Sequence, residues 1–362
     1  MHFMDNPNEG IFWILENQYT EQGKQRILER LKDFQTAGVN WIRILVSPNW
    51  GRRDIYANPL PTIQKVNDLM ALTREGKNAG KFTIELVLDG NRWNADYVNP
   101  KTGKQGKAEQ YFVDPYPYRN DKAWFKTWID HLNFENLGMI MFAGDTAPCK
   151  KWGNKPESKV KCYESEAPPS HWQDEEYYKN NGRWVTTIYA WFAQAYPSLN
   201  VAFEVGHGGD FDEMSANADW VKRHLPAMPV FATALYIHLG DTEDWRSYRE
   251  ETDRFIDEAE RRSEKKLWID EIGYGRKGNR YSANDRSEAR QKAYFDGVLA
   301  SLVRYRKNKY PTFAWVAGDD YRDHDPEHAW YGLLTEKMGS GGHQKVWSPA
   351  WNTLSLYYNL QE

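Results

Sequence analysis

The sequence has 362 residues, more than the about 100–200 of an ordinary domain, so it forms either two domains or one large barrel. Lys and Arg number 47 against 51 Asp and Glu, and the resulting net charge of −4 excludes the strongly basic surface with which proteins bind phosphate backbones. Charged residues make up 27% and hydrophobic residues 40%, as in globular rather than disordered proteins. We therefore expect a folded protein with no nucleic-acid partner.

Short apolar runs typical of strands alternate with helical patterns along the chain. The predicted strands are Ile11–Leu15, Val39–Val46, Phe82–Leu88, Met139–Ala143, Val201–Val205, Val230–His238, Leu267–Ile272 and Thr312–Val316. The predicted helices that follow them are Glu21–Thr36, Thr62–Gly76, Lys122–Phe134, Arg183–Tyr196, Phe211–His224, Trp245–Ser263, Arg286–Lys307 and Pro349–Leu360. Eight strands separated by helices predict an α/β fold, a single (β/α)8 TIM barrel over residues 1–362.

The alternative to a barrel is an open, doubly wound sheet. Against it, no Gly-rich phosphate-binding turn follows the first predicted strand. Three connections are long, from Asp89 to Asn120, from Thr146 to Gly182, and from Val316 to about Val346. All three follow the C-terminal ends of predicted strands, the face on which TIM barrels carry their active sites. The barrel is therefore the preferred interpretation, with long loops on its C-terminal face.

We expect neither a membrane span nor a signal peptide in this sequence. No apolar run approaches the about 18–20 residues of a membrane span. Met1–Gly10 lacks the basic and then apolar pattern of a signal peptide. Cys149 and Cys162 flank a lysine-rich segment that we interpret as a solvated loop; they could form a disulfide in a secreted protein or remain thiols in a cytoplasmic one. Secretion or a periplasmic location is favoured by the substrate inferred below.

Aromatic residues are unusually frequent, with 17 Trp, 22 Tyr and 15 Phe, or 15% of the chain. A large core can use such side chains. Flat rings beside polar groups also suit a sugar-binding cleft, because they stack on the C–H faces of pyranose rings. Composition alone does not choose between these two roles.

Acidic residues cluster at the ends of predicted strands. Asp89 ends the third strand, Asp145 follows the fourth, Glu204 lies in the fifth, and Asp270 and Glu271 end the seventh. Because side chains alternate along a strand, we expect Glu271 to point into the barrel mouth and Asp270 towards the helices. A charge at these positions is costly unless it is paired or used.

Glycoside hydrolases use two carboxyl groups on opposite sides of the active site. One donates a proton, and the other attacks the sugar or activates water. The plainer role of any single carboxylate is an ion pair, and Arg43 on the second predicted strand is a ready partner. Arg43 could also keep a nucleophilic carboxylate ionised through its charge.

Several motifs make this interpretation more specific. The segment from Ala37 to Val46, AGVNWIRILV, resembles the second strand of clan A glycoside hydrolases, the retaining (β/α)8 enzymes that include cellulases and mannanases. The segment from Lys266 to Gly273, KLWIDEIG, resembles their seventh strand, which ends in the nucleophilic glutamate. Tyr236-Ile-His238 is loosely similar to their strand-six motif, and Thr312–Trp315 followed by WYGLL is similar to the eighth strand. The resemblance implies that Glu271 is the nucleophile, Arg43 its electrostatic partner and Trp315 a platform for the sugar.

The sequence departs from that family at the acid/base. Clan A enzymes carry Asn-Glu at the end of strand four, whereas Gly144-Asp145 stands there by strand count. By local sequence, the segment Ala202-Phe-Glu204 is more similar to the strand that precedes an Asn-Glu pair. Asp145 and Glu204 are therefore both candidate acids. The mechanism could be retaining at a carboxyl separation of ~5–5.5 Å or inverting at ~6.5–9.5 Å.

Further residues on the expected active face could bind a polysaccharide or oligosaccharide, which the resemblance implies is β-linked and cut within the chain. These candidates for substrate binding are Arg43, Trp50, Asp89, Arg92, Trp93, His207, Tyr236, His238, Trp315 and Trp330. No metal or other cofactor is expected for this chemistry.

Two other functions remain open. His207, Asp210 and His238, with Glu271, could form the centre of a metal-dependent barrel hydrolase, although Asp210 is better explained as the N-cap of the following helix. The missing Asn-Glu also allows a barrel that binds carbohydrate without catalysis.

Overall fold

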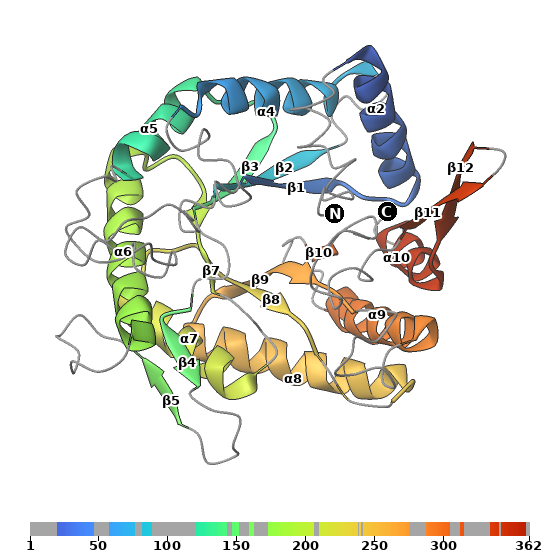
Figure 1. Cartoon of the computed structure of the whole chain (residues 1–362). Coiled ribbons are helices and arrows are strands. Elements are labelled where there is room, and N and C mark those ends of the chain that lie inside the picture. Colours follow the sequence, from blue (N-terminus) through green and yellow to red (C-terminus); the bar gives the residue numbers. More distant parts are fainter. Residues whose placement is uncertain are drawn as a thin grey trace.

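The fold is a set of parallel strands surrounded by a ring of helices (Figure 1). The computed structural model describes residues 20–46, 58–76, 82–88, 121–142, 147–151, 159–162, 173–205, 210–237, 239, 242–274, 287–304, 312–314, 334–339 and 342–359. The predicted first strand, Ile11–Leu15, lies outside these residues. The other seven predicted strands all have counterparts in the structure.

The strands form two parallel four-stranded sheets. In order across the first sheet they are β1 (Trp41–Val46), β2 (Thr83–Leu88), β3 (Leu137–Met141) and β6 (Val201–Ala202). The second sheet has the order β10 (Thr312–Ala314), β9 (Lys266–Ile272), β8 (Val230–Leu235) and β7 (Glu204–Val205). Only Phe203 separates β6 from β7, so the two sheets continue into one another. This strand order confirms the predicted TIM barrel.

Helices surround these strands, and several have the bounds that the sequence predicts. They are α2 (Glu21–Thr36), α4 (Leu60–Leu72), α5 (Asp121–His131), α6 (Gln173–Ala195), α7 (Phe211–His224), α8 (Trp245–Ser263), α9 (Glu288–Arg304) and α10 (Pro349–Asn359). Of the described helices, the last lies near the first, because Trp351 of α10 packs against Phe34 of α2 with 6.4 Å between ring centroids. None of the described helices is long and apolar enough to cross a membrane.

Side-chain caps fix where three of these helices begin. Thr20, Asp210 and Asp244 each accept a hydrogen bond from a backbone N–H group in the first turn of α2, α7 and α8, respectively. Such caps satisfy donors that have no partner within the helix. The predicted capping role of Asp210 is therefore confirmed.

Between strands and helices lies an aromatic part of the core. Phe142, which directly follows β3, packs against Phe125 of α5, Phe192 of α6 and Phe203 between β6 and β7, at centroid distances of 5.7 to 6.4 Å. Many of the aromatic residues therefore fill the core, one of the two roles that composition left open.

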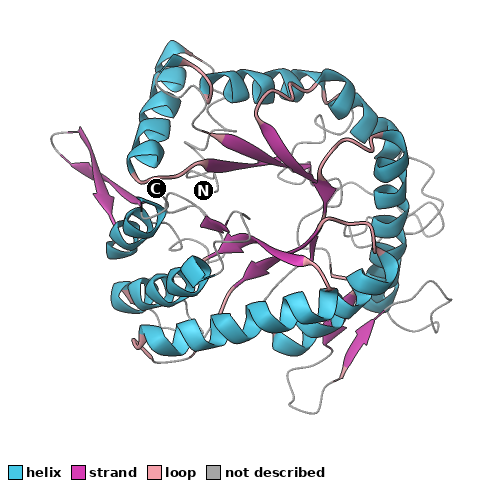
Figure 2. Cartoon of the chain, turned by 180° about the vertical axis from the view of Figure 1, so that it is seen from behind, coloured by secondary structure: helices cyan, strands magenta, loops and turns pink. Residues whose placement is uncertain are grey.

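Two hairpins lie outside the ring of helices, and neither was predicted (Figure 2). The lysine-rich segment expected to be a loop contains β4 (Cys149–Lys151) paired antiparallel with β5 (Val160–Cys162). Cys149 and Cys162 form a disulfide between them, one of the two states that the sequence left open. The second hairpin pairs β11 (Leu334–Gly339) with β12 (Gly342–Trp347), within the third long connection.

Candidate active site

A single buried arginine organises the centre of the barrel. Arg43 of β1 is 1% exposed, and carboxyl groups surround its guanidinium. Its Nε atom lies 2.9 Å from Oε1 of Glu85 on β2, and its Nη2 atom lies 3.0 Å from Oε2 of Glu204 on β7. Nη2 also lies 3.6 Å from Oδ2 of Asp270, and Nη1 donates a hydrogen bond to Oε1 of Glu271. Arg43 therefore connects four carboxyl groups from three other strands.

The two consecutive acids of β9 share this partner because β9 carries an extra residue. Thr233 and Leu235 of β8 are two residues apart, whereas their partners Ile269 and Ile272 are three apart, so the register shifts at this point. The pairing with β10 shifts over the same residues. Such a bulge interrupts the alternation of side chains along a strand. The prediction that Asp270 points towards the helices was therefore wrong, because it assumed unbroken alternation.

Glu271 is the carboxyl group of this cluster that is most accessible. It is 6% exposed, compared with 1% for Glu204 and 0% for Glu85 and Asp270. Its Oε2 atom accepts a hydrogen bond of 2.8 Å from the hydroxyl group of Tyr236, which directly follows β8. Arg43 and Tyr236 thus hold one oxygen each of the Glu271 carboxylate, an orientation that suits a nucleophile at the C-terminal end of the strands.

Glu85 is a member of the cluster that the sequence did not single out. It lies in the middle of β2 rather than at a strand end, and it pairs in register with Arg43. Its second oxygen accepts a hydrogen bond of 2.7 Å from the indole N–H of Trp268 on β9. The sequence did contain a signal for Glu85. It is an isolated charged residue in an apolar strand, and that strand follows the one that carries Arg43.

Burial and charge act in opposite directions on the groups of this cluster. Burial alone would lower the pKa of Arg43, but its carboxyl neighbours raise that pKa well above its usual value. Burial raises the pKa of Glu85 to about 7, although Arg43 and the hydrogen bond from Trp268 lower it. Glu85 therefore changes its charge near neutral pH.

Asp270 is the more deeply buried of the two consecutive acids of β9. Burial raises the pKa of Asp270 well above its usual value; the attraction of Arg43 opposes this shift and the repulsion from Glu85 and Glu271 adds to it. The interaction with Glu204 also lowers the pKa of Asp270, against the effect of burial.

The structure brings together Arg43, Glu204, Tyr236 and Glu271 from the residues predicted for the site. The other predicted site residues lie outside the described part of the chain: Trp50, Asp89, Arg92, Trp93, Asp145, His207, His238, Trp315 and Trp330.

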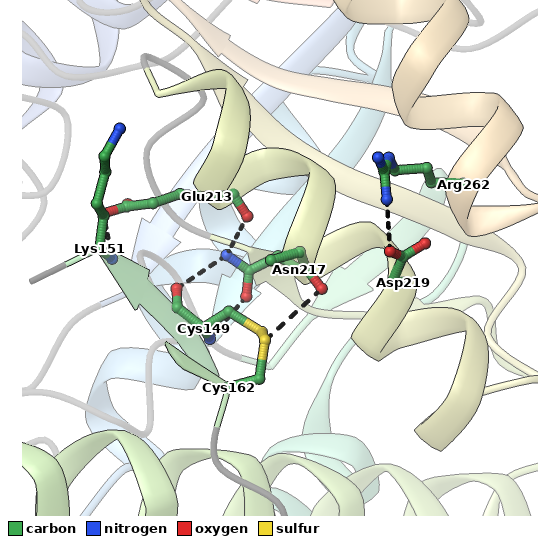
Figure 3. The surroundings of a disulfide bond; sticks show 8 residues. Cys149, Lys151, Cys162, Glu213, Asn217, Asp219 and Arg262 are labelled. Atoms are coloured by element: carbon green, nitrogen blue, oxygen red, sulfur yellow. Dashed lines mark hydrogen bonds and ion pairs between the residues drawn. A yellow bond between two sulfur atoms is a disulfide. The ribbon is translucent and has the colours of Figure 1, made fainter. Parts of the chain in front are cut away.

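The disulfide hairpin is attached to the start of α7, the helix that follows Glu204 (Figure 3). The side chain of Asn217 accepts a bond of 2.9 Å from the backbone N–H of Cys149 and donates one of 3.0 Å to its carbonyl. Glu213 accepts a bond of 2.8 Å from the backbone N–H of Lys151. The hairpin therefore helps to fix the N-terminus of α7.

The Asp210 carboxylate, considered as a metal ligand, has other partners. It accepts hydrogen bonds from the backbone N–H groups of Asp212 and Glu213 and lies 3.2 Å from Nζ of Lys151. Burial alone would raise the pKa of Asp210, but these bonds and the charge of Lys151 lower it below its usual value. Within the described residues, no three His, Cys, Asp or Glu side chains are grouped as a metal site would require.

Comparison with known proteins identifies the fold. No protein-family model matches the sequence, and no curated protein matches it. Among solved structures, the chain is similar to GH5_18 from Streptomyces cattleya in complex with GlcNAc, with a TM-score of 0.62 and 10% identity over 100% of this chain and 80% of that one. It is also similar to the beta-glycosidase BGL167, with a TM-score of 0.57 and 13% identity over 100% and 95% of the two chains. A third similar structure is a GH2 beta-galacturonidase from Eisenbergiella tayi bound to galacturonate, with a TM-score of 0.53, 11% identity, and coverage of 100% and 50%.

These structural neighbours define the class of fold. All three are glycoside hydrolases by their descriptions, and the alignment extends over the whole of this chain. The chain thus has the TIM-barrel fold of glycoside hydrolases, and Glu271 of its carboxyl cluster lies near the C-terminal end of β9, on the side where such barrels carry active sites. A shared fold does not assign a reaction, which has to be argued from the site.

Proposed function

We propose that this protein is a glycoside hydrolase in which Glu271 is the nucleophile. The observation that carries the proposal is the Glu271 carboxylate itself, held by Arg43 on one oxygen and by Tyr236 on the other at the C-terminal end of β9. The neighbouring cation favours the ionised form, which a nucleophile needs. Glu271 is also the most accessible carboxyl group of the cluster, as a nucleophile that contacts a sugar has to be.

Of the two candidate acids, Asp145 is favoured. Glu204 is 1% exposed and forms an ion pair with Arg43, which favours its charged form, whereas a general acid needs a proton and access to the leaving oxygen. Asp145 lies four residues after β3, the fourth strand of the predicted barrel, where related folds supply the acid. Asp145 itself lies outside the residues that the structure describes.

The expected substrate is a β-linked polysaccharide or oligosaccharide cut within the chain, as the sequence resemblance implies. We further propose that residues 1–362 form one catalytic barrel, which the packing of α10 on α2 supports. A location outside the cytoplasm is supported by the disulfide between Cys149 and Cys162, since disulfides persist in oxidising compartments.

A panel of polysaccharides and oligosaccharides, with products identified by mass, tests the proposal. We expect the wild type to release reducing ends from at least one glycan, and we expect Glu271→Gln and Asp145→Asn to reduce turnover at least about 1,000-fold. Glu251→Gln, which removes a carboxylate from an ion pair on the outer helix α8, is the matched control and should retain full activity. Binding of a glycan without cleavage by the wild type would instead identify a carbohydrate-binding barrel.

A further inference from the structure

Glu85 holds Arg43 from the side opposite to the proposed nucleophile. Both Nη atoms of Arg43 face the acids at the strand ends, whereas its Nε atom faces Glu85 deeper in the barrel. Because a guanidinium is planar and rigid, fixing Nε fixes the directions of both Nη atoms. Glu85 is 0% exposed, so it influences a bound sugar only through its neighbours.

Each carboxyl oxygen of Glu85 has its own partner. One lies 2.9 Å from Nε of Arg43, and the other accepts the bond of 2.7 Å from the indole of Trp268. Trp268 packs edge-on against Trp41 of β1, with 5.4 Å between ring centroids and an interplanar angle of 84°. The ring of Trp41 occupies the space beside Gly138, where a Cβ atom would lie only 2.3 Å from it. The contacts thus join β1, β2, β3 and β9 beneath the site.

Charge balance does not explain Glu85. Arg43 already contacts Glu204, Asp270 and Glu271, and one cation does not need a fourth carboxyl group. The charge of Glu85 also repels that of Asp270. A group that adds repulsion to the cluster is better explained by the geometry it imposes.

We propose that Glu85 and Trp268 form an inner brace that holds the Arg43 guanidinium in the orientation in which it contacts Glu271. Glu85 is then a positioning residue for hydrolysis, and this role rests on the proposed function. Side chains that reach a reacting group through another residue act by keeping it within a fraction of an ångström of its productive geometry.

Glu85→Gln separates this role from a general contribution to folding. Glutamine keeps the shape of the side chain but has one carbonyl oxygen for two donors, Nε–H of Arg43 and Nε1–H of Trp268. Removing the indole donor as well, in Glu85→Gln/Trp268→Phe, leaves that oxygen free to accept from Arg43. The double variant should therefore recover activity that the single variant loses.

The first measurement needs no substrate. In proton–nitrogen correlation spectra, the indole N–H signal of Trp268, assigned by its loss in Trp268→Phe, should shift in Glu85→Gln. It should not shift in Ile84→Val, a matched control on the opposite face of the same strand. An indole signal unchanged by Glu85→Gln would overturn the brace whether or not the protein is an enzyme.

The second measurement uses a glycan that the wild type cleaves. We expect Glu85→Gln to lower kcat about 10- to 100-fold, the cost of misplacing a reacting group, with KM changed less than about two-fold. Glu85→Gln/Trp268→Phe should regain most of this loss, and Ile84→Val should retain wild-type kcat. A wild-type kcat in Glu85→Gln, or a loss that the double variant does not recover, would overturn the proposal while the proposed function stands. Absence of hydrolysis by the wild type would overturn the proposed function and the positioning role together.

Discussion

Asp270 and Glu271 are consecutive residues of β9, and both of their carboxyl groups contact the guanidinium of Arg43. The bulge that makes this possible gives the two acids different environments. Asp270 is fully buried, and burial raises its pKa well above its usual value, whereas Glu271 is 6% exposed and accepts a hydrogen bond from Tyr236. One strand thus supplies a fully buried acid inside the cluster and a more accessible acid beside Tyr236.

Removing the cation should destabilise the protein strongly. Arg43→Met leaves buried carboxyl groups without their counter-charge, and breaking a buried ion pair from one side costs about 3–5 kcal/mol. Arg43→Lys keeps the charge but lacks the planar guanidinium that reaches several carboxyl groups. Its loss of unfolding free energy should therefore be smaller than that of Arg43→Met. Urea denaturation at pH 7 measures both. A loss below about 1 kcal/mol in Arg43→Met would show that Arg43 does not organise the cluster.

The stability of the protein should fall as the pH rises towards 8. Glu85 has a folded-state pKa of about 7, above the value of 4.5 for an ordinary glutamate, so between these values the folded protein holds a proton that the unfolded chain has lost. The stabilisation is complete below about pH 4.5 and is lost as the pH passes 7, with a total on the order of a few kcal/mol. Among the described residues, the groups facing Glu85 are Arg43 from β1 and Trp268 and Asp270 from β9, and Asp270 adds a dependence of the same sign.

Denaturation of the wild type and Glu85→Gln from pH 5 to pH 8 tests this dependence. The glutamine cannot ionise, so the free energy of unfolding of the variant should vary less with pH. Parallel curves for the two proteins would show that Glu85 does not titrate in this range.

The disulfide should stabilise the protein by about 3 kcal/mol, since it closes a loop with a sequence separation of 13. Cys149→Ala/Cys162→Ala should lose this amount relative to the oxidised wild type, and reductant should lower the melting temperature of the wild type only. Lys159→Ala, an exposed change in the same hairpin, is the control and should change the stability little. An equal effect of reductant on the double variant would mean that the disulfide does not carry the stabilisation.

Tyr294 of α9 connects the ends of the two strands that carry Tyr236 and Glu271. Its hydroxyl group donates to the carbonyl of Leu235 and accepts a bond of 3.2 Å from the backbone N–H of Gly273. Tyr294→Phe leaves both buried backbone groups without this partner, so we expect a loss of about 1–3 kcal/mol in unfolding free energy and slower hydrolysis. Tyr189→Phe, on α6, is the matched control for loss of a phenol hydroxyl. Equal effects of the two variants on hydrolysis would contradict a specific role for Tyr294.

Much of the fold could be predicted from the sequence because its signals are local. The bounds of α2, α7 and α8 were predicted to the residue, since polar caps such as Asp210 and Asp244 mark their starts. The hairpins were missed for the opposite reason. β4 and β5 have three residues each and are rich in lysine, so no apolar pattern distinguishes them from a loop. The run Gly339-Ser-Gly-Gly342, typical of a hairpin turn, was a usable signal for β11 and β12.

The site was predicted in part. The pairing of Arg43 with Glu271 followed from the motifs, and the structure confirms the contact. The position of Asp270 could not follow, because a bulge is set by the pairing of β9 with its neighbours and has no mark in the strand itself. Glu85 was missed because only acids at strand ends were considered.

The most direct test of Glu271 as the nucleophile is the effect of azide on Glu271→Ala, using a glycoside that the wild type cleaves. In a retaining enzyme that has lost its nucleophile, azide occupies the vacated space and attacks the sugar once, so activity returns and the product is a glycosyl azide of inverted configuration. We predict this product for Glu271→Ala, identified by its mass and anomeric proton coupling. A glycosyl azide of retained configuration would make Glu271 the acid/base, and unimpaired hydrolysis by Glu271→Ala without azide would contradict the account.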